Sequence, residues 1–269
     1  MRLTDGPVSI HDLTLAKQRG ERFVMITAYD ANMAALLDEV GVPVLLVGDS
    51  LGMVVLGHST TLPVTLDEMI HHTAAVARGT QHALIVADLP FGSYQNGPVD
   101  AFDASTRLLK ESGAHAVKLE GGRTMVETVG HLVDRGIPVM GHLGLTPQSV
   151  HQFGGFRVQG RDEASARQIV QDAVALTDAG AFSIVLECIP ADLADEVTAA
   201  VAVPTIGIGA GAGTDAQVLV WHDLLGLTTG HRPRFVKAYA DLRSQISDAV
   251  RSFHAEVANG EFPGPEHRY

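Results

Sequence analysis

The sequence has a single cysteine, Cys188, among its 269 residues, so no internal disulfide can form. A chain with so little cysteine fits a reducing compartment, and we expect it to be cytoplasmic. No apolar run reaches the roughly 18 residues that a membrane-spanning helix needs. The N-terminal segment MRLTDGPVSIHDL also lacks the apolar core of a secretory signal. These absences argue against a membrane partner.

Positive charge is scarce as well. The 19 lysines and arginines are outnumbered by 31 acidic residues, which gives a formal net charge of −12. No run of lysines or arginines stands out, so the composition argues against nucleic acid and anionic membranes as partners. Hydrophobic residues make up 46% of the chain and charged residues only 19%, which leaves enough apolar material for a sizeable core.

Short apolar runs alternate with helix-period segments along the chain, and such runs are typical of strands buried on both faces. We predict eight strands, near residues 23–28, 43–48, 83–88, 115–120, 137–141, 182–187, 203–208 and 223–227. Helix-period segments follow them, near residues 30–40, 65–78, 100–112, 123–135, 163–179, 190–201, 214–221 and 234–258. Eight such units predict an α/β fold, a single-domain (β/α)8 TIM barrel over residues 1–269. The alternative is an open doubly wound sheet.

Local signals support this division. Thr65 and Glu68 form a capping-box pattern at the start of a helix. Residues 9–20 are typical of an extra N-terminal helix that covers the bottom of the barrel, and residues 259–269 are expected to form an extended tail after the C-terminal helix. Glycines of the type that ends helices stand before four of the strands, at Gly41, Gly113, Gly136 and Gly180.

Four of the apolar runs lead into an acidic residue, namely Asp49, Asp88, Glu120 and Glu187. Their spacings of 39, 32 and 67 residues correspond to one or two βα units, so the carboxylates should meet at the end of the barrel where active sites lie. Two long connections, 49–64 and 142–162, emerge there and are expected to be binding loops. Converging carboxylates repel each other unless a cation lies among them. The pattern therefore predicts Mg²⁺ or Mn²⁺ rather than zinc, and metal-assisted chemistry on an oxygen-rich substrate.

Each of these residues also has a structural interpretation. Asp49 and Asp88 are candidate metal ligands, and capping of the following loop or helix is the alternative of equal weight for each. Lys118 and Glu120 face the same side of a strand, which suits a contact to an anion or carbonyl group, or a structural ion pair. His142 is a candidate ligand, a hydrogen-bond donor to substrate, or a core histidine whose hydrogen bonds are satisfied. We favour the donor role.

Glu187 is a candidate general base, because a carboxylate near a polarised carbonyl compound can remove a proton from carbon. The alternative is a partner to Lys118 or to an arginine. Cys188 is interpreted as a buried small hydrophobic residue and not as a nucleophile. The glycine run at 207–213 is a weak match to a dinucleotide fingerprint, since it follows the seventh strand. It indicates either a tight turn or a close approach to an anionic part of the substrate.

Nine segments, spread from about residue 25 to residue 240, carry a resemblance to one enzyme family. They are TAYD (27–30), LLVGDSLGMVVLGH (45–58), TLPVT (61–65), VADLPFGSY (86–94), VKLEGG (117–122), GHLGLTPQSV (141–150), GGFRVQGR (154–161), VLECIP (185–190) and PTIGIGAG (204–211). In order and spacing they resemble the ketopantoate (3-methyl-2-oxobutanoate) hydroxymethyltransferases, transferases of pantothenate and coenzyme A biosynthesis. One departure is Asp215-Ala216-Gln217, where the family more often has a central glycine.

The resemblance implies a (β/α)8 barrel assembled as a homo-oligomer, a decamer of two pentameric rings. It also implies one Mg²⁺ per subunit at positions matching Asp49, Asp88 and Glu120. The 2-oxo acid would chelate this metal through its carboxylate and keto oxygen.

The resemblance further implies a reaction. A hydroxymethyl group would pass from 5,10-methylenetetrahydrofolate to 3-methyl-2-oxobutanoate and give 2-dehydropantoate (ketopantoate). Ser50, Asp88 and Lys118 match substrate-binding positions, and we place Asp49 and His142 with them. Glu187 matches the proton acceptor that enolises the metal-bound oxo acid.

Two other functions fit parts of the pattern. A Mg²⁺-dependent lyase or mutase of the isocitrate lyase or phosphoenolpyruvate mutase type also works on a barrel, but such lyases place a cysteine acid on a mobile loop. The only cysteine here, Cys188, is predicted on a strand. A non-catalytic oxo-acid-binding module would have no need of Glu187. A metal-dependent turnover assay separates all three.

Overall fold

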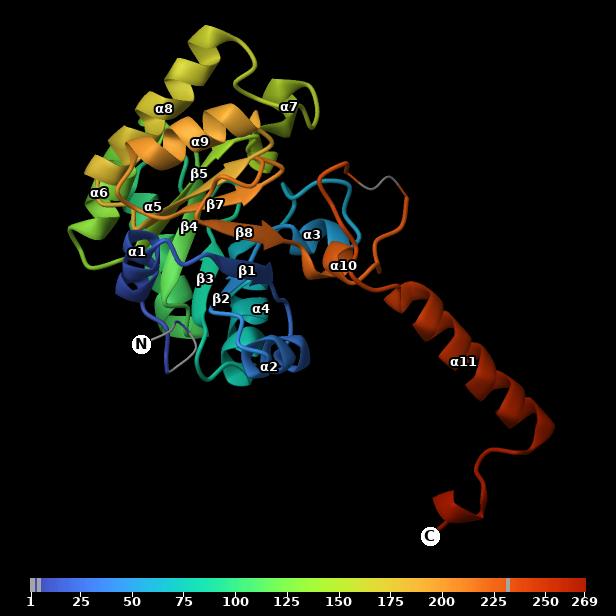
Figure 1. Ribbon diagram of the computed structural model, residues 1–269. Coiled ribbons are helices and arrows are strands. Elements are labelled where there is room, and N and C mark those ends of the chain that lie inside the picture. The colour runs from blue at the N-terminus through green and yellow to red at the C-terminus, as the bar shows by residue number, and fades with distance from the viewer. Residues whose placement is uncertain (1–2, 4–5, 231–232) are drawn as a thin grey trace. The chain divides into compact units, whose positions relative to one another are not determined.

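The protein forms a closed barrel of parallel strands in a computed structural model that describes residue 3, residues 6–230 and residues 233–269 (Figure 1). The strands are β1 (Phe23–Thr27), β2 (Val44–Val47), β3 (Leu84–Asp88), β4 (Ala116–Glu120), β5 (Val139–Gly144), β6 (Ser183–Glu187), β7 (Thr205–Ile208) and β8 (Ala216–Leu219). They pair in chain order, and β8 closes on β1. The predicted (β/α)8 barrel is therefore confirmed, and the open sheet is excluded.

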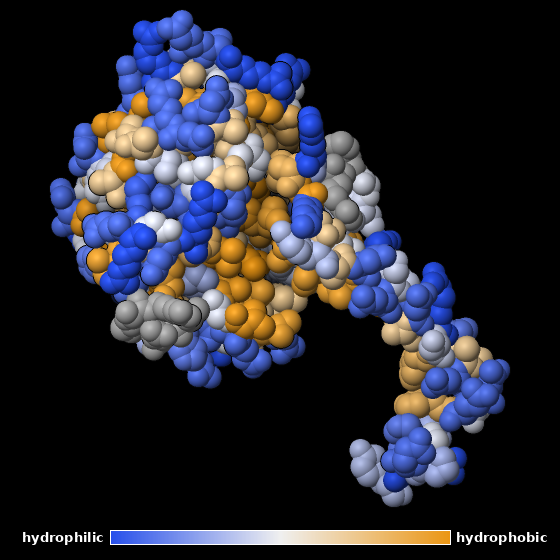
Figure 2. Space-filling view, in the orientation of Figure 1, coloured by the Kyte–Doolittle hydropathy of each residue, from blue (hydrophilic) through white to orange (hydrophobic). Residues whose placement is uncertain are grey.

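Helices connect most of the strands. They are α1 (Ile10–Arg19), α2 (Ala31–Glu39), α3 (Leu51–Val54), α4 (Leu66–Gly79), α5 (Pro98–Arg107), α6 (Val126–Val133), α7 (Val150–Phe153), α8 (Glu163–Asp178), α9 (Ala191–Ala200), α10 (Trp221–Leu224) and α11 (Leu242–Asn259). Thr65 and Glu68 form the predicted capping box at the start of α4. The four predicted end glycines all have positive φ, between 81° and 98°. Hydrophilic side chains cover much of the visible outer surface of the barrel, as amphipathic helices require (Figure 2).

The lower end of the barrel, where the strands begin, is filled by apolar side chains. Leu13 and Ala16 of α1 are buried against this cluster, which confirms that the N-terminal helix covers the barrel bottom. The cluster includes the first residues of several strands, among them Phe23, Val44, Leu84, Ala116 and Ala216. This end is packed with hydrocarbon, and the acidic, lysine and histidine residues of the strands lie toward the opposite end, which we call the barrel mouth.

The predicted positions of the last strand and of the helix before it are wrong. β8 lies at Ala216–Leu219, inside the segment 214–221 that was expected to be helical, and the expected strand at 223–227 overlaps α10 instead. Along β8 the first and third residues are buried and Gln217 is exposed, which is the period-two pattern of a strand. The denser apolar run that follows carried a stronger signal in the sequence. Residues 209–215, all of them described, form a loop without a helix.

The chain divides into two compact units, Met1–Val220 with the barrel and Trp221–Tyr269 with α10 and α11. The prediction of one domain over residues 1–269 stays a prediction. In the second unit α11 begins at Leu242, later than expected, after Asp241 accepts a hydrogen bond from the Ser244 amide. None of the described helices is long and apolar enough to cross a membrane.

The tail after α11 was expected to be extended, and this is wrong. The Phe262 ring packs edge-on against Phe253 of α11, with the ring centroids 5.2 Å apart. A short 3-10 turn, Pro265–His267, follows. Contact between two aromatic rings favours this folded-back arrangement.

Candidate active site

The barrel mouth collects the acidic residues that the sequence placed there. Asp88, Glu120 and Glu187 are the last residues of β3, β4 and β6, and Asp49 follows the end of β2 by two positions. Strand register explains their neighbours. Asp88 lies beside Lys118 in the pairing of β3 with β4, and Glu120 lies beside a histidine of β5.

Lys118 and the two aspartates form one half of the site. The Lys118 ammonium lies 2.6 Å from Asp88 Oδ1, and the Asp49 backbone amide donates to Asp88 Oδ2 at 3.0 Å. All three side chains are buried. The aspartates therefore interact with the site itself rather than capping a helix, which removes that alternative for both.

The pKa values of these groups reflect burial and crowding of like charge. Burial raises the pKa of Asp49 well above its usual range, and the neighbouring Asp88 and Glu120 carboxylates raise it further. Burial also raises the pKa of Asp88, against the opposing effect of Lys118. Burial lowers the pKa of Lys118, but the surrounding carboxylates outweigh it and raise that pKa, so the lysine remains a cation.

His142 lies between two carboxylates in the other half of the site. Its Nδ1 is 3.4 Å from Glu120 Oε1 and its Nε2 is 3.2 Å from Glu187 Oε2, although neither contact has hydrogen-bond geometry. Burial and Lys118 lower the pKa of His142, but the two glutamates outweigh them and raise it to about 9. A histidine with that pKa is protonated at neutral pH, so it can donate at both nitrogens. Glu187 therefore pairs with His142 rather than with Lys118.

The backbone around Glu187 turns sharply. Gly144, at the end of β5, has φ +91°, and a Cβ placed on it would lie 2.2 Å from the Glu187 carbonyl oxygen. The Leu145 amide donates to the same oxygen at 2.8 Å. The next residue, Cys188, has φ +48°, an uncommon value for a residue other than glycine. The end of β6 is thus held by close backbone contacts with the turn that follows β5.

Cys188 lies just beyond β6 and is half-buried, so the predictions that it is on a strand and fully buried are wrong. Burial, together with the Glu187 charge, raises the pKa of its thiol to about 11. Because the thiolate is the reactive form, this agrees with the interpretation that Cys188 is not a nucleophile.

Sequence reasoning missed two residues of the site, Gln148 and Tyr94. The Gln148 side-chain amide donates to Asp49 Oδ2 at 2.9 Å, and its backbone amide donates to Glu120 Oε2 at 2.9 Å. The Tyr94 hydroxyl donates to Gln148 Oε1 at 2.7 Å. Both residues lie in segments that carried the family resemblance, and Gln148 lies in a connection already expected to bind ligand. Uncharged side chains on loops gave no separate signal.

Ser50 is half-buried at the start of α3, immediately after Asp49. Its hydroxyl lies 2.9 Å from the Tyr29 hydroxyl, so these two segments of the resemblance meet in space. Burial raises the pKa of Tyr29, and the phenol stays protonated at neutral pH. The pair places hydroxyl groups beside the carboxylates.

The donor set at the barrel mouth fits a hard divalent cation. Asp49, Asp88 and Glu120 are buried carboxylates, and the charges of Asp88 and Glu120 raise the pKa of Asp49. A cation would offset that repulsion. Within the part of the chain that the structure describes, no group of three or more acidic, histidine or cysteine side chains is arranged so that the group could by itself hold a metal ion. Mg²⁺ is usually held by one or two carboxylates, with waters and substrate completing its shell. The residues present suit that open kind of site.

The glycine run at 207–213 is explained by packing. A Cβ on Gly213 would lie 1.6 Å from Asp195 Oδ1 of α9, and Gly209 and Gly211 have positive φ. The turn interpretation is therefore sufficient for this run. Asp215, at the unusual Asp-Ala-Gln sequence, accepts hydrogen bonds from Lys17 and from the Thr205 amide.

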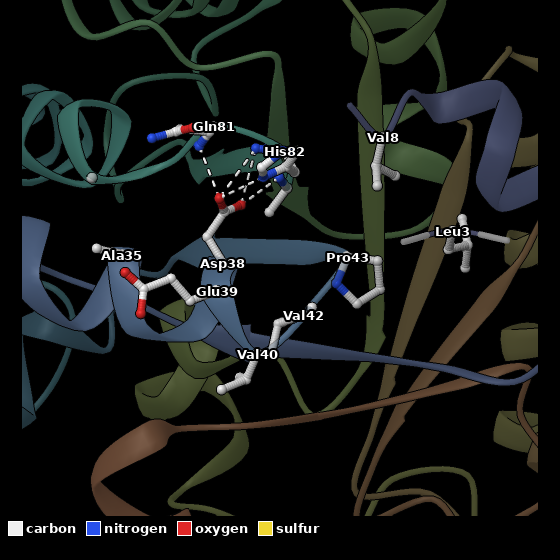
Figure 3. Close-up of a pocket in the computed structure, with 13 residues that line it drawn as sticks. Leu3, Val8, Ala35, Asp38, Glu39, Val40, Val42, Pro43, Gln81 and His82 are labelled. Carbon is white, nitrogen blue, oxygen red and sulfur yellow. Dashed lines mark hydrogen bonds and ion pairs between the residues drawn. The ribbon is translucent and has the colours of Figure 1, made fainter. Parts of the chain in front are cut away.

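A cavity of about 510 Å³ lies at the opposite end of the barrel from this site (Figure 3). It lies where α2 ends and where β2 and β3 begin, and its charged residues are Asp38, Glu39 and His82. The Asp38 carboxylate already accepts hydrogen bonds from the backbone amides of Gln81, His82 and Ala83. His82 Nδ1 also lies 3.0 Å from Asp38 Oδ2, so two of these three residues are engaged in structure.

The family model for ketopantoate hydroxymethyltransferase matches residues 7–265. The chain belongs to the ketopantoate hydroxymethyltransferase family. It is similar to the 3-methyl-2-oxobutanoate hydroxymethyltransferase of Frankia casuarinae, with 58% identity over 97% of this chain and 88% of the relative. The enzyme of that name from Magnetococcus marinus is also 58% identical, over 97% of this chain and 98% of the relative. The resemblance drawn from the nine segments is thereby confirmed.

Solved structures show how widely this family shares its barrel. A phosphonomutase-like protein from Burkholderia cenocepacia has a TM-score of 0.61 at 14% identity, covering 94% of this chain and 100% of that one. A 2,3-dimethylmalate lyase of the phosphoenolpyruvate mutase/isocitrate lyase superfamily has a TM-score of 0.58 at 17% identity, covering 95% and 89%. Likeness at this identity concerns the fold alone.

Proposed function

We propose that this family member transfers a hydroxymethyl group from 5,10-methylenetetrahydrofolate to 3-methyl-2-oxobutanoate. The products are 2-dehydropantoate and tetrahydrofolate, and one water is consumed. The observation that carries the proposal is the single cluster of three buried carboxylates, one lysine and one histidine, in which the histidine also contacts the less buried Glu187. Such a set can bind a 2-oxo acid and remove a proton from it.

We assign Asp49, Asp88 and Glu120 as the residues that would hold one Mg²⁺ per subunit. When bound, a divalent cation polarises a carbonyl oxygen and so acidifies the neighbouring carbon. The support is the all-oxygen donor set and the excess of negative charge at the site. The nearby Gln148 amide and Lys118 ammonium neutralise only part of that charge.

The protein's own side chains have distinct tasks in this proposal. Lys118 stabilises negative charge that develops on the keto oxygen of the oxo acid, because it is a cation fixed in a buried site. Ser50 donates to the substrate carboxylate. Glu187 takes the proton from C3, and the carbanion then attacks the one-carbon unit of the folate. His142 faces Glu187 and holds its carboxylate in one orientation.

The rival lyase chemistry lacks its expected acid here. Such lyases place a cysteine on a mobile loop, whereas Cys188 is half-buried just beyond β6 and burial raises its thiol pKa to about 11. A non-catalytic pocket has no use for a carboxylate like Glu187. We therefore retain the transferase proposal.

The direct test is formation of 2-dehydropantoate from 3-methyl-2-oxobutanoate and 5,10-methylenetetrahydrofolate, with and without chelator. Isocitrate and phosphonopyruvate serve as control substrates for the lyase and mutase alternatives. We expect Mg²⁺-dependent product only with the oxo acid and the folate together. Turnover of a control substrate without formation of 2-dehydropantoate would replace this proposal.

A further inference from the structure

Gln148 is the most connected uncharged side chain at the barrel mouth. Its amide nitrogen donates to Asp49 Oδ2 and to the Leu89 carbonyl, both at 2.9 Å. Its amide oxygen accepts from Tyr94 at 2.7 Å and from Gln95 at 2.9 Å. Both amide hydrogens and the oxygen are therefore engaged. An amide with these partners has one orientation, because a flip would set donors against donors and acceptors against acceptors.

The backbone of the same residue reaches a second carboxylate. The Gln148 amide donates to Glu120 Oε2 at 2.9 Å, and residue 148 is buried, with 6% of its surface exposed. One residue from the loop after β5 thus contacts two of the three carboxylates assigned to the cation. Those carboxylates lie at different strands, Asp49 just after β2 and Glu120 at the end of β4. Through Gln148 the loop fixes their relative positions.

Tyr94 holds Gln148 from the other side. Its hydroxyl donates to Gln148 Oε1 and accepts from the Glu120 backbone amide at 3.0 Å. The Tyr94 side chain is 1% exposed, so its ring is locked by packing. A hydroxyl held by a packed ring is a rigid support for the amide next to it.

We propose that Gln148, supported by Tyr94, is a positioning residue that holds the Asp49 and Glu120 carboxylates in the arrangement that binds the cation. This inference rests on the proposed function for the cation itself. Groups that orient metal ligands contribute about 10- to 100-fold to metal affinity or activity. Gln148 would act before any substrate is present, so its contribution is measurable without turnover.

The experiment compares wild type with Gln148→Met, Tyr94→Phe and the double variant. Gln148→Met keeps the length of the side chain and removes its side-chain hydrogen bonds, while the backbone bond to Glu120 remains. Tyr94→Phe removes only the hydroxyl. Mn²⁺ binding is measured by titration calorimetry without substrate, and kcat and KM are measured separately. Gln152→Met is the matched control, because Gln152 is exposed in α7, within the same connection between β5 and β6. Circular dichroism and thermal unfolding report whether each variant is folded.

We expect Gln148→Met to weaken Mn²⁺ binding about 10- to 100-fold, Tyr94→Phe to weaken it less, and the control to match wild type. The double variant should lose less than the product of the single losses, because Tyr94 acts largely through Gln148. If both folded single variants bind Mn²⁺ with wild-type affinity, the inference is overturned. That outcome would not affect the proposed reaction.

The two proposals fail in different ways. A wild-type protein that binds Mn²⁺ but makes no 2-dehydropantoate would overturn the proposed reaction, and the affinities alone would then decide the role of Gln148. A wild-type protein that makes the product but binds no Mn²⁺ would overturn the cation assignment and this inference with it.

Discussion

Glu187 differs from the other acidic residues of the barrel mouth in its exposure. Its side chain is 16% exposed, whereas those of Asp88 and Glu120 are each 4% exposed and Asp49 is buried as well. Ligands of a cation benefit from shielding, since an ion interacts more strongly with its ligands where water is excluded. A base has to reach a carbon atom of a substrate that enters from solvent. The exposures therefore match the roles proposed for the four residues.

The first prediction concerns Glu187 as the base. Glu187→Gln keeps the size of the side chain but loses its basicity, so exchange of the C3 hydrogen of 3-methyl-2-oxobutanoate with deuterated water should fall about 10²- to 10⁴-fold. Proton NMR of the C3 signal with Mg²⁺ present measures this. The variant should still bind the oxo acid, because Lys118 and the proposed cation ligands Asp49, Asp88 and Glu120 remain. Calorimetry measures this binding. Exchange at the wild-type rate would show that Glu187 is not the base.

At the scale of elements, the site depends on how the turn after β5 meets the end of β6. Gly144 is the contact point, since a Cβ there would lie 2.2 Å from the Glu187 carbonyl oxygen and 2.8 Å from Ile189 Cγ2. Neither a backbone oxygen nor a buried isoleucine can move away cheaply. The positive φ of +91° adds a conformational cost for any side chain.

The second prediction is that Gly144→Ala lowers kcat by displacing Glu187, with Mn²⁺ affinity unchanged because Glu187 is not a cation ligand. Steady-state kinetics and calorimetry measure the two quantities. Gly154→Ala is the control: its φ is +66°, but a Cβ there would meet nothing within 4 Å. Gly154→Ala should lower the free energy of unfolding by about 1–2 kcal/mol at most and leave kcat unchanged. Equal losses in both variants would mean that strain in the loop, not Glu187, is responsible.

A third prediction concerns the link between α2 and β3 at the barrel bottom. The Asp38 carboxylate accepts from three successive backbone amides, of which Ala83 is the closest at 2.7 Å. Asp38→Ala leaves the buried Ala83 N–H, and the partly buried N–H groups of Gln81 and His82, without this acceptor and should lower the free energy of unfolding by about 1–3 kcal/mol. Urea unfolding measures this. Glu39→Ala, at the exposed neighbouring position, is the control. Activity of the folded variant should be unchanged.

The loss of stability in Asp38→Ala should depend on pH, because the Asp38 carboxylate is titratable. Burial raises the pKa of Asp38, but the amide donors outweigh it and lower the pKa below its usual value. A group with a lowered folded-state pKa contributes stability above its unfolded pKa, about 3.9, and loses it as the pH falls through the folded pKa. The difference between wild type and Asp38→Ala should therefore be constant near neutral pH and shrink below about pH 4. A difference that grows on acidification would contradict this sign.

The sequence predicted elements better than contacts. The first seven strands overlap their predicted segments, because each is a compact apolar run followed by a polar or glycine stop. β8 was misplaced because its half-exposed alternation is weaker than the apolar run at 223–227. The carboxylates were predictable since charge at the end of a buried strand is unusual. Gln148 and Tyr94 were not, because their role depends on where two loops fold.

At the scale of the whole molecule, the barrel separates stability from chemistry. Hydrocarbon, α1 and the Asp38 contacts occupy the end where strands begin, and the charged cluster occupies the end where strands finish. This is the usual division in (β/α)8 enzymes. It explains why buried charges are tolerated, since the packed bottom offsets the cost of burying them at the mouth.

The last prediction joins the cation to the assembly. The family resemblance leads us to expect a decamer, ten times the mass of the 28.4 kDa chain. The proposed cation ligands Asp49, Asp88 and Glu120 all belong to strand ends of one barrel, so the cation bridges no subunits. Exhaustive chelation should therefore abolish activity while the particle keeps its mass, and added Mg²⁺ should restore turnover. Mass photometry and the product assay on the same sample measure both. Monomers alone, before and after chelation, would contradict the assembly, and full activity in a metal-free sample would contradict the cation. Dissociation on chelation would show instead that the cation lies between subunits.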